Sequence, residues 1–368
     1  MTRVRERGFP ADPEPLPVPV ADNHTHLESI AHVLPAGVVA PTVAEHFARA
    51  RAAGVDRIVQ VGCDLLSARW TVEQLTAHCH PAHRDFAQGD RLRRSSSCHP
   101  AHRDFARHRL RGAESQDLGD AATLRAQHDS STTLRTQHDR STRNPLVGAI
   151  AIHPNEAVMH AGAHDVGPDG QEYVPAPHHA TPLDDAIAEI AVLARANPRV
   201  RAIGETGLDY FRTGPRGAAV QRDAFRAHLA LARELSLPVQ IHDRDAHSDV
   251  LAILQADGAP ERTVFHCFSG DEAMAREVAA NGWFLSLAGP ITYKANDELR
   301  RAARAVPLSQ LLVETDAPYL TPLPFRGQPN APFVVAHTVR ALALILEQPL
   351  ERVCSVISDT SDQVYGPW

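Results

Sequence analysis

The chain has 368 residues, of which 43% are hydrophobic, and its formal net charge is −7 at pH 7. The length allows one large domain or two smaller ones, and the apolar content supplies a sizeable core. The negative charge argues against a broad nucleic-acid-binding surface but is compatible with a small cleft that contains metal ions. No window approaches about 18 uninterrupted apolar residues, so we expect no membrane-spanning helix.

The N-terminal residues 1–17 are rich in proline and charged side chains and contain no apolar core segment. They lack the pattern of a secretory signal, and we expect an irregular lead-in. The cysteines are odd in number and scattered, at Cys63, Cys79, Cys98, Cys267 and Cys354. This distribution is typical of free thiols in a reducing compartment. We therefore expect a cytoplasmic protein, without membrane association and without an obligate protein partner.

Short apolar runs alternate with amphipathic stretches along the chain. Strands are predicted at 18–21, 57–61, 147–152, 201–204, 238–241, 263–265, 283–287 and 310–313, and helices include 41–53, 183–196, 220–235, 248–256, 272–280, 296–305 and 331–347. Eight strands that alternate with helices favour a TIM (β/α)₈ barrel, built as one domain over residues 18–368. The alternative is an open doubly wound sheet, which normally carries a Gly-rich turn after its first strand, and this sequence has none.

Residues 78–144 interrupt the pattern before the third predicted strand. The sequence CHPAHRDFA occurs at 79–87 and again at 98–106, and LRAQHDSST at 124–132 nearly matches LRTQHDRST at 134–142. We expect a disordered low-complexity insertion here. Its CHPAH copies offer ligands for zinc, but the strand and turn signals of a zinc-binding unit are missing, so we favour a duplicated polar stretch. A smaller interruption, rich in Gly, Pro and His, covers 161–182.

Side chains that can bind metal follow several of the predicted strands. His24 and His26 occupy alternate positions just after the first strand, so their imidazoles project to the same side. The carboxyl ends of barrel strands meet at one face, and further candidates follow the later strands. The complete set is His24, His26, Glu205, His242, His266 and Asp316. A single histidine at a strand end is more often structural than a ligand, and it is the joint occurrence that predicts a metal centre.

Four imidazoles and two carboxylates suit two divalent ions, because a catalytic zinc takes three protein ligands and leaves one position for water. Glu205 is the natural bridge, since each of its oxygens can bind one ion. Asp316 is predicted to accept or shuttle the proton of the activated water. The donor set is compatible with Zn²⁺, Mn²⁺ and Mg²⁺.

Other residues near the strand ends are candidates for binding substrate. His153 suits a phosphate or a water, although a turn hydrogen bond beside the next proline is an equal alternative. Ser269 is expected to open a helix, as an anion site or as an ordinary N-cap. Arg326 is placed to make a bidentate phosphate contact, or else pairs with a carboxylate. Tyr293 and Lys294 follow the seventh predicted strand, where they suit a base and a phosphate backbone.

The motifs HTH, AIHPNEA, GETGLDY, IHDRD, HCFSG and ETDAPYLTPLPFRGQPNAP occur in this order between Val20 and the C-terminal region. Together they resemble the TatD-like metal-dependent deoxyribonucleases. The resemblance implies a TIM barrel, a divalent-metal centre and hydrolysis of DNA phosphodiesters, in several members as a 3′ exonuclease. It assigns the ligand role to the same six side chains: His24, His26, Glu205, His242, His266 and Asp316. The chain departs from the family mainly through the insertion upstream of AIHPNEA.

The sequence thus predicts cleavage of DNA, single-stranded or at 3′ ends, by a 3′–5′ exonuclease that uses a two-metal-activated water. A hydrolase of the same fold that acts on a small lactone, amide or phosphoester is the alternative. Relatives of that kind that bridge their metals with a carboxylated lysine are excluded, because the only lysine, Lys294, lies after the seventh predicted strand. A non-catalytic metal- or nucleic-acid-binding protein is the third possibility.

Overall fold

The computed structural model describes residues 8–77 and 145–368. The predicted insertion at 78–144, with both CHPAH copies, lies outside the described residues, as do residues 1–7. Residues 8–19 contain no helix or strand. Within the described ranges no single helix combines the length and apolar character needed to cross a membrane, and only the bent pair Pro332–Ile345 and Leu350–Tyr365 meets both criteria jointly.

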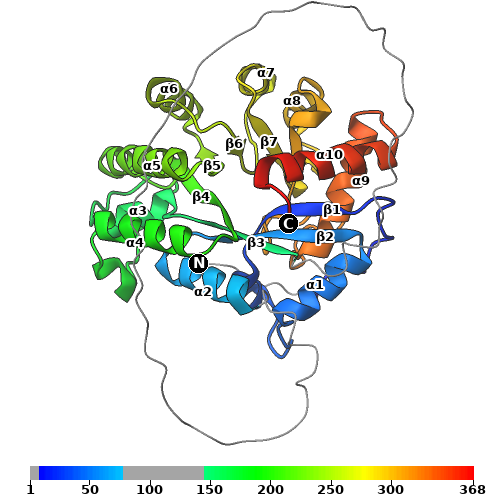
Figure 1. Ribbon diagram of the computed structural model, residues 1–368, viewed down its shortest axis with the longest axis horizontal. Coiled ribbons are helices and arrows are strands. Elements are labelled where there is room, and N and C mark those ends of the chain that lie inside the picture. Colours follow the sequence, from blue (N-terminus) through cyan, green and yellow to red (C-terminus); the bar gives the residue numbers. More distant parts are fainter. Residues whose placement is uncertain (1–7, 78–144) are drawn as a thin grey trace, which may run out of the picture. The chain divides into compact units, whose positions relative to one another are not determined.

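Eight parallel strands form one sheet in the order β1 to β8 (Figure 1). Their bounds are β1 Val20–Thr25, β2 Val55–Gly62, β3 Leu146–Ile150, β4 Val200–Asp209, β5 Val239–Arg244, β6 Thr263–Phe265, β7 Phe284–Leu287 and β8 Leu311–Val313. Beyond β8 the chain returns to β1, where Thr25 and Ala317 form a parallel bridge and the His26 N–H donates to the Ala317 carbonyl at 2.8 Å. The sheet therefore approaches a closed barrel, and the predicted TIM-barrel fold is confirmed.

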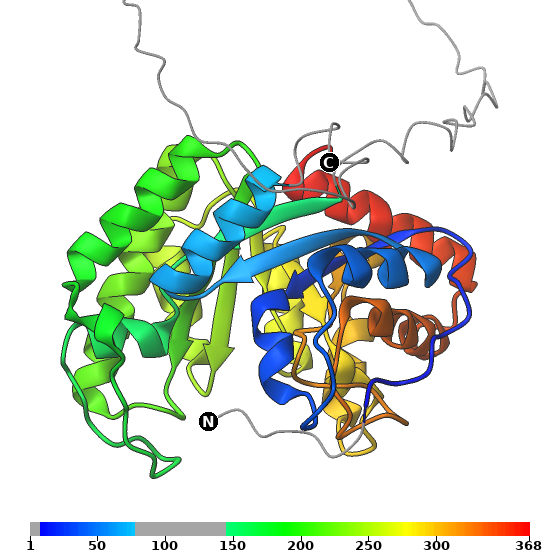
Figure 2. The ribbon, with the colours of Figure 1, turned by 90° about the horizontal axis from the view of Figure 1, so that it is seen from below.

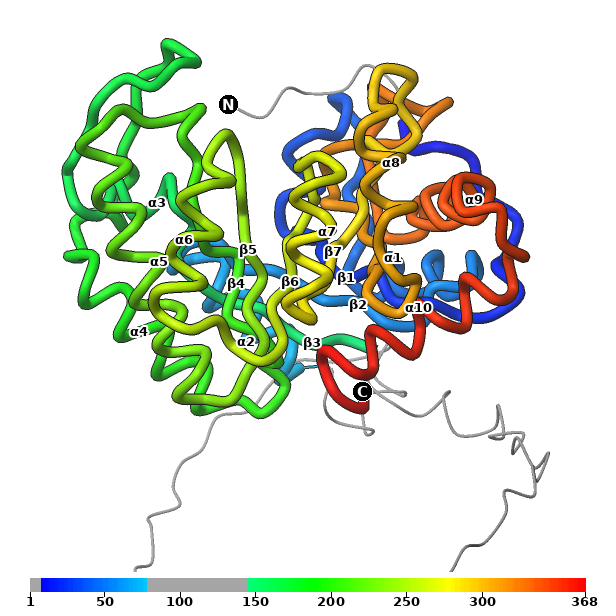
Figure 3. Tube along the Cα trace, turned by 90° about the horizontal axis from the view of Figure 1, so that it is seen from above, coloured from blue at the N-terminus to red at the C-terminus, as the bar shows by residue number. Residues whose placement is uncertain are grey.

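The α-helices lie outside the sheet, as two views at right angles to Figure 1 show (Figures 2 and 3). They are α1 Val43–Ala52, α2 Leu65–Ala77, α3 Pro154–His160, α4 Leu183–Ala196, α5 Pro215–Leu235, α6 His247–Asp257, α7 Glu272–Ala280, α8 Asp297–Arg304, α9 Val335–Ile345 and α10 Leu350–Tyr365. Short 3₁₀ helices are η1 Leu27–Val33, η3 Pro177–Ala180, η4 Gly289–Thr292, η5 Leu308–Gln310 and η6 Pro332–Val334. The predicted segments 183–196 and 272–280 coincide with α4 and α7.

Apolar side chains fill both the barrel and the layer between barrel and helices. On α5 the fully buried Phe225 and Leu229 are four residues apart, so both face the sheet. Inside the barrel, valines and alanines of the strands surround Tyr365 of α10, whose hydroxyl accepts a hydrogen bond from the Gln240 side chain at 2.7 Å. Burying a side chain of this size stabilises the fold by about 1.5–3 kcal/mol. The C-terminal helix thus helps to fill the barrel interior.

Three strands extend further than their sequences predicted. His24, Glu205 and His242 lie within β1, β4 and β5 rather than beyond the strand ends. The reason is that β4 and β5 remain paired past the apolar run, after a register shift between Ile203 and Thr206. The strands approach closely there, since a Cβ added at Gly207, whose φ is +142°, would lie 2.0 Å from the His242 carbonyl oxygen. This ladder holds the side chains of the site on rigid backbone.

Candidate metal centre

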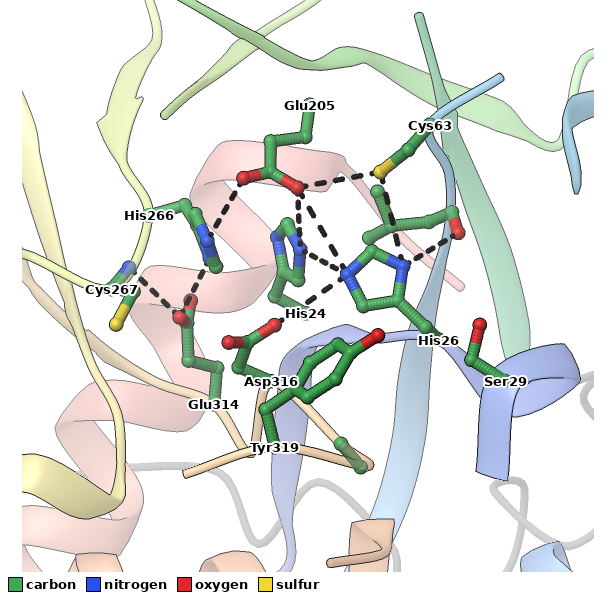
Figure 4. A network of polar contacts seen from close by, with 12 residues as sticks. His24, His26, Ser29, Cys63, Glu205, His266, Cys267, Glu314, Asp316 and Tyr319 are labelled. Carbon is green, nitrogen blue, oxygen red and sulfur yellow. Dashed lines mark hydrogen bonds and ion pairs between the residues drawn. The ribbon is translucent and has the colours of Figure 1, made fainter. Parts of the chain in front are cut away.

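One group of possible ligands is formed by β1, β4 and the loop after β8. The Nε2 atoms of His24 and His26 lie 3.2 Å apart (Figure 4). Glu205 Oε2 is 3.7 Å from the first and 3.9 Å from the second. Asp316 Oδ1 is 3.5 Å from His26 Nε2. Two ligands of one tetrahedral zinc are separated by about 3.3–3.5 Å, so these atoms are spaced to share an ion.

A second group surrounds the other oxygen of the same carboxylate. Glu205 Oε1 lies 2.5 Å from His242 Nδ1, 3.2 Å from His266 Nε2 and 3.6 Å from His153 Nε2. The two oxygens of Glu205 therefore face two different sets of imidazoles. A carboxylate placed in this way can bridge two cations.

Three of these imidazoles have a carbonyl or carboxylate oxygen beside their outer nitrogen, which is a hydrogen bond for His26 and a charged contact for His242 and His266. His26 Nδ1 lies 3.2 Å from the Val61 carbonyl, His266 Nδ1 lies 2.8 Å from Glu314, and His242 Nε2 lies 3.4 Å from Asp209. A proton on the outer nitrogen leaves a lone pair on the nitrogen that faces Glu205. Metal-binding histidines in proteins almost always have such a partner.

The outer nitrogen of His24 completes no hydrogen bond, as is also the case for His242 and His266 among the residues that the structure describes. The ring of His24 is fully buried, and its Nδ1 makes no hydrogen bond to any residue that the structure describes. It stacks on His266 with ring centroids 3.6 Å apart. Burial is the largest cause that lowers the pKa of His24, to about 3, and His266 adds to it. His24 is therefore neutral, as a metal ligand must be.

In His153, the N-cap of α3, the positions of proton and lone pair are reversed. Its Nδ1 accepts the Asn155 N–H at 3.1 Å, so the neutral ring carries its proton on Nε2, which points toward Glu205. Burial lowers the pKa of His153 to about 4. A neutral ring with an inward N–H suits a hydrogen-bond donor better than a metal ligand. The structure thus places His153 at the pocket with an inward N–H, and its contact with substrate stays a prediction.

The pKa values of these side chains fit a site that binds cations. Burial alone would raise the pKa of Glu205, but His266, His153 and His242 outweigh it and hold that pKa well below its usual range. Burial also disfavours the charged forms of His26 and His242, yet the surrounding carboxylates raise both pKa values to about 9. Without metal these two imidazoles carry protons that divalent ions would displace.

A pocket of about 760 Å³ opens onto this centre. Glu205, His26 and His153 line it, together with the aromatic side chains of Trp70 and Tyr319. Imidazole and carboxylate donors fit zinc and manganese. The residues present therefore fit a pair of divalent ions.

The remaining predicted substrate residues do not line this pocket. Ser269 is exposed and donates to the Asp243 carbonyl at 3.3 Å. The prediction that it opens a helix is wrong, because Asp271 is the N-cap of α7 and accepts the Met274 N–H at 2.8 Å.

The loops after β7 and β8 hold the other three predicted contacts. The guanidinium of Arg326 lies 4.6 Å from the ring centroid of Tyr293, whose hydroxyl donates to the Thr321 carbonyl at 3.0 Å. Arg326 and Lys294 are exposed. Their roles in binding substrate stay predictions.

Sequence analysis left three side chains of the centre without a role. Asp209 and Glu314 are almost fully buried and hold His242 and His266. Their signal was available, since Asp209 lies in GETGLDY and Glu314 two residues before Asp316. Cys63 Sγ lies 3.3 Å from Glu205 Oε2, and burial raises its thiol pKa well above the usual value. It faces the centre as a neutral thiol.

Comparison with known proteins supports the same kind of site. Residues 21–366 match the family described as TatD related DNase. The chain is 46% identical over 195 residues to the uncharacterized metal-dependent hydrolase TatD of Mycobacterium tuberculosis, which covers 52% of this chain and 74% of that protein. It is 38% identical over 172 residues to the uncharacterized metal-dependent hydrolase YabD of Bacillus subtilis, with 46% and 67% covered. The 3′-5′ ssDNA/RNA exonuclease TatD of Klebsiella pneumoniae is 37% identical over 174 residues, with 45% and 65% covered.

Solved structures agree at the level of the fold. The TatD homologue YjjV of Escherichia coli superposes with a TM-score of 0.62 at 20% identity, covering 95% of this chain and 98% of that one. A TatD family hydrolase of Entamoeba histolytica gives 0.64 at 16% identity, covering 96% and 100%. With the family match over nearly the whole described barrel, these findings show that the chain belongs to the TatD-related DNase family of metal-dependent hydrolases.

Proposed function

We propose that this protein is a divalent-metal-dependent nuclease that hydrolyses DNA phosphodiester bonds and releases nucleotides from 3′ ends. The observation that carries the proposal is the position of Glu205, whose two oxygens face two separate sets of imidazoles. Membership of the family supports the hydrolytic activity, and the Klebsiella relative, named a 3′-5′ ssDNA/RNA exonuclease, supports the substrate and direction.

Two ions are expected at this centre. His24, His26, Asp316 and Glu205 Oε2 would hold the first, and His242, His266 and Glu205 Oε1 the second. Such ions, when bound, neutralise the charge of a phosphate and lower the pKa of a water near them. Zn²⁺, Mn²⁺ and Mg²⁺ remain the candidates.

Asp316 is assigned the proton that leaves the attacking water. Its backbone has a φ of +51°, and its N–H donates to the His24 carbonyl at 2.9 Å. This left-handed conformation, uncommon for a residue other than glycine, aims the carboxylate at His26. The carboxylate is 14% exposed, so it reaches both the ligand group and solvent. A group in this position can take a proton and pass it to water.

The pocket wall supplies contacts for the rest of the substrate. His153 would donate its Nε2 proton to a phosphate oxygen. Trp70 and Tyr319 offer aromatic faces on which an unpaired base can stack, which favours single strands and frayed 3′ ends. We further propose a cytoplasmic location, because Cys63, Cys267 and Cys354 carry free thiols.

The proposal is tested with single-stranded oligonucleotides labelled at either end and incubated with Zn²⁺, Mn²⁺ or Mg²⁺. We expect mononucleotides to appear first from the 3′ end, and chelation to stop their release. A small lactone, an amide and a phosphotriester serve as comparison substrates. Hydrolysis of one of these with no cleavage of DNA under any metal would overturn the proposal in favour of a small-molecule hydrolase.

A further inference from the structure

A second cluster of histidines lies apart from the metal centre, where α3 meets the segment 161–182. His160 ends α3, while His178 and His179 belong to η3. One ligand atom of each lies within 4.8 Å of the other two. The ring centroids of His178 and His179 are 4.0 Å apart, and that of His160 is 4.9 Å from His179.

One ring nitrogen of His160 is buried and unpaired next to this cluster. Its Nδ1 lies 2.7 Å from the Thr181 carbonyl, and because a carbonyl only accepts, the Nδ1 carries the proton. The neutral ring therefore has its lone pair on Nε2. The residue is 6% exposed, and its Nε2 has no hydrogen-bond partner among residues 8–77 and 145–368. A buried polar atom without a partner destabilises the fold, so a lone pair in this place calls for a ligand.

Glu156 brings a carboxylate to the same place, one helical turn before His160. Its Oε2 lies 2.7 Å from His179 Nε2 and 3.5 Å from His178 Nε2. The Nδ1 of His179 accepts the Ala176 N–H at 2.7 Å, so its Nε2 carries a proton and donates to Glu156. His179 thus fixes the carboxylate. The 3.5 Å from the same oxygen to His178 Nε2 is a long polar contact, and it also matches the separation of two ligands around one zinc, about 3.3–3.5 Å.

We propose that His160, His178 and Glu156 bind a divalent transition-metal ion, with Zn²⁺ the best match, and that His179 positions Glu156. A fourth ligand is at hand, because an oxygen of Asp64 lies within 4.8 Å of ligand atoms of Glu156 and His178. The group with His160 and the group with Asp64 and Glu156 share His178, and an ion held by ligands from both would have two imidazoles and two carboxylates, a donor set that zinc accepts. The hydrogen bond from His179 is the outer-shell support that metal-binding carboxylates usually have.

An ion at this site would connect three parts of the chain. Asp64 follows β2, Glu156 and His160 belong to α3, and His178 belongs to the segment that is otherwise nearly without regular structure. The ion would also offset the negative charges of Glu156 and Asp64, which lie close together. Burial, and after it the charge of Asp64, raises the pKa of Glu156 to about 7. Asp64 and Glu156 line the pocket that reaches Glu205. The ion therefore adds positive charge to the pocket wall.

The test counts zinc in the full chain after loading and dialysis, by mass spectrometry. His160→Ala and Glu156→Gln should each bind one Zn²⁺ fewer per chain than the wild type. His164→Ala changes an exposed histidine of the same segment and should keep the wild-type count. Equal counts in His160→Ala, Glu156→Gln and His164→Ala would overturn the proposal.

Two further measurements separate this site from the centre and from misfolding. Glu156→Gln keeps the size of the side chain and still accepts from His179, so its loss of zinc would reflect the ligand rather than the fold. Zn²⁺ should slow proteolysis within 161–182 in the wild type and in His164→Ala but not in Glu156→Gln. A rate of cleavage in the wild type that does not change with zinc would contradict the inference. Neither readout depends on nuclease activity, so the proposed function can fail while this site is confirmed.

Discussion

Replacing Glu205 with Gln is the sharpest perturbation of the metal centre, because it preserves the volume of the side chain and removes its charge. Glu205 is 4% exposed, and its oxygens lie within 4 Å of His24, His26, His153, His242 and His266. The variant therefore loses the one anion that faces both sets of imidazoles. The replacement would lower the pKa of His242 and favour its neutral form, because Glu205 is the strongest partner that raises this pKa.

The size of the effect follows from the number of ions involved. Removing an outer-shell partner of a ligand costs roughly 10–100-fold in metal affinity. Glu205 is a ligand that both ions would share, so its replacement should lower the affinity for each ion by at least the upper end of that range, about 100-fold or 2.8 kcal/mol of binding free energy. Loss of the charge beside the reacting phosphate should lower kcat by roughly 10²–10³-fold even at saturating metal.

The assay measures release of labelled nucleotides and metal content of the same samples. Glu234→Gln is the matched control, since the same chemical change falls on a side chain that is 61% exposed and pairs with Arg195. It should keep wild-type activity and metal content. A Glu205→Gln protein with near-normal turnover and unchanged metal would refute the bridging role.

Three other outcomes are expected. Because His26 and His242 have pKa values of about 9 without metal, the apparent metal affinity should rise as the pH approaches 9. Calorimetric titrations in which the affinity stays flat or falls over this range would contradict this. Asp316→Asn should lower kcat by roughly 10²–10⁴-fold with little change in KM. A variant whose KM rises by the same factor as its kcat falls would contradict the role of Asp316 in proton transfer. His228→Leu leaves the Ile152 N–H without its acceptor at 3.1 Å and should reduce the free energy of unfolding by about 1–3 kcal/mol. Burial lowers the pKa of His228 from 6.5 to about 4, so its contribution is present above pH 6.5 and is lost as the pH falls toward 4, which denaturation at several pH values would show.

The barrel was predictable because its strands are buried on both faces and read as short apolar runs. The run 263–265 coincides with β6, and the other seven predicted strands overlap the observed ones. The polar ends of β1, β4 and β5 were not predictable from apolar content, since Asp22, His24 and Glu205 are buried inside strands by partners that only the fold supplies.

The helices α3 and α10 were missing from the predicted ranges for different reasons. α3 has only seven residues and begins at Pro154, directly after the N-cap His153. α10 has a clear buried stripe at Val353, Ile357 and Val364, but serine and threonine residues on the same helix are buried too and weaken the pattern. Of the two, α3 matters for the proposals, because it carries Glu156 and His160.

The candidate ligands converge as the strand order of a barrel requires. The motifs contain Asp209 and Glu314, but they do not show which imidazole each of these carboxylates contacts. Asp209, Glu314 and the Val61 carbonyl lie beside the outer nitrogens of His242, His266 and His26. The inward N–H of His153 depends on the Asn155 backbone at the start of α3. Such tautomers follow from contacts between segments and are invisible in a motif.

Anomalous diffraction from crystals soaked in Mn²⁺ or Zn²⁺ tests the central claim most directly. Our account predicts two peaks about 3.5–4 Å apart, with one oxygen of Glu205 on each and with His24, His26 and Asp316 on one side and His242 and His266 on the other. A single peak that Glu205 does not touch, or no peak at this centre at metal concentrations that support activity, would contradict it.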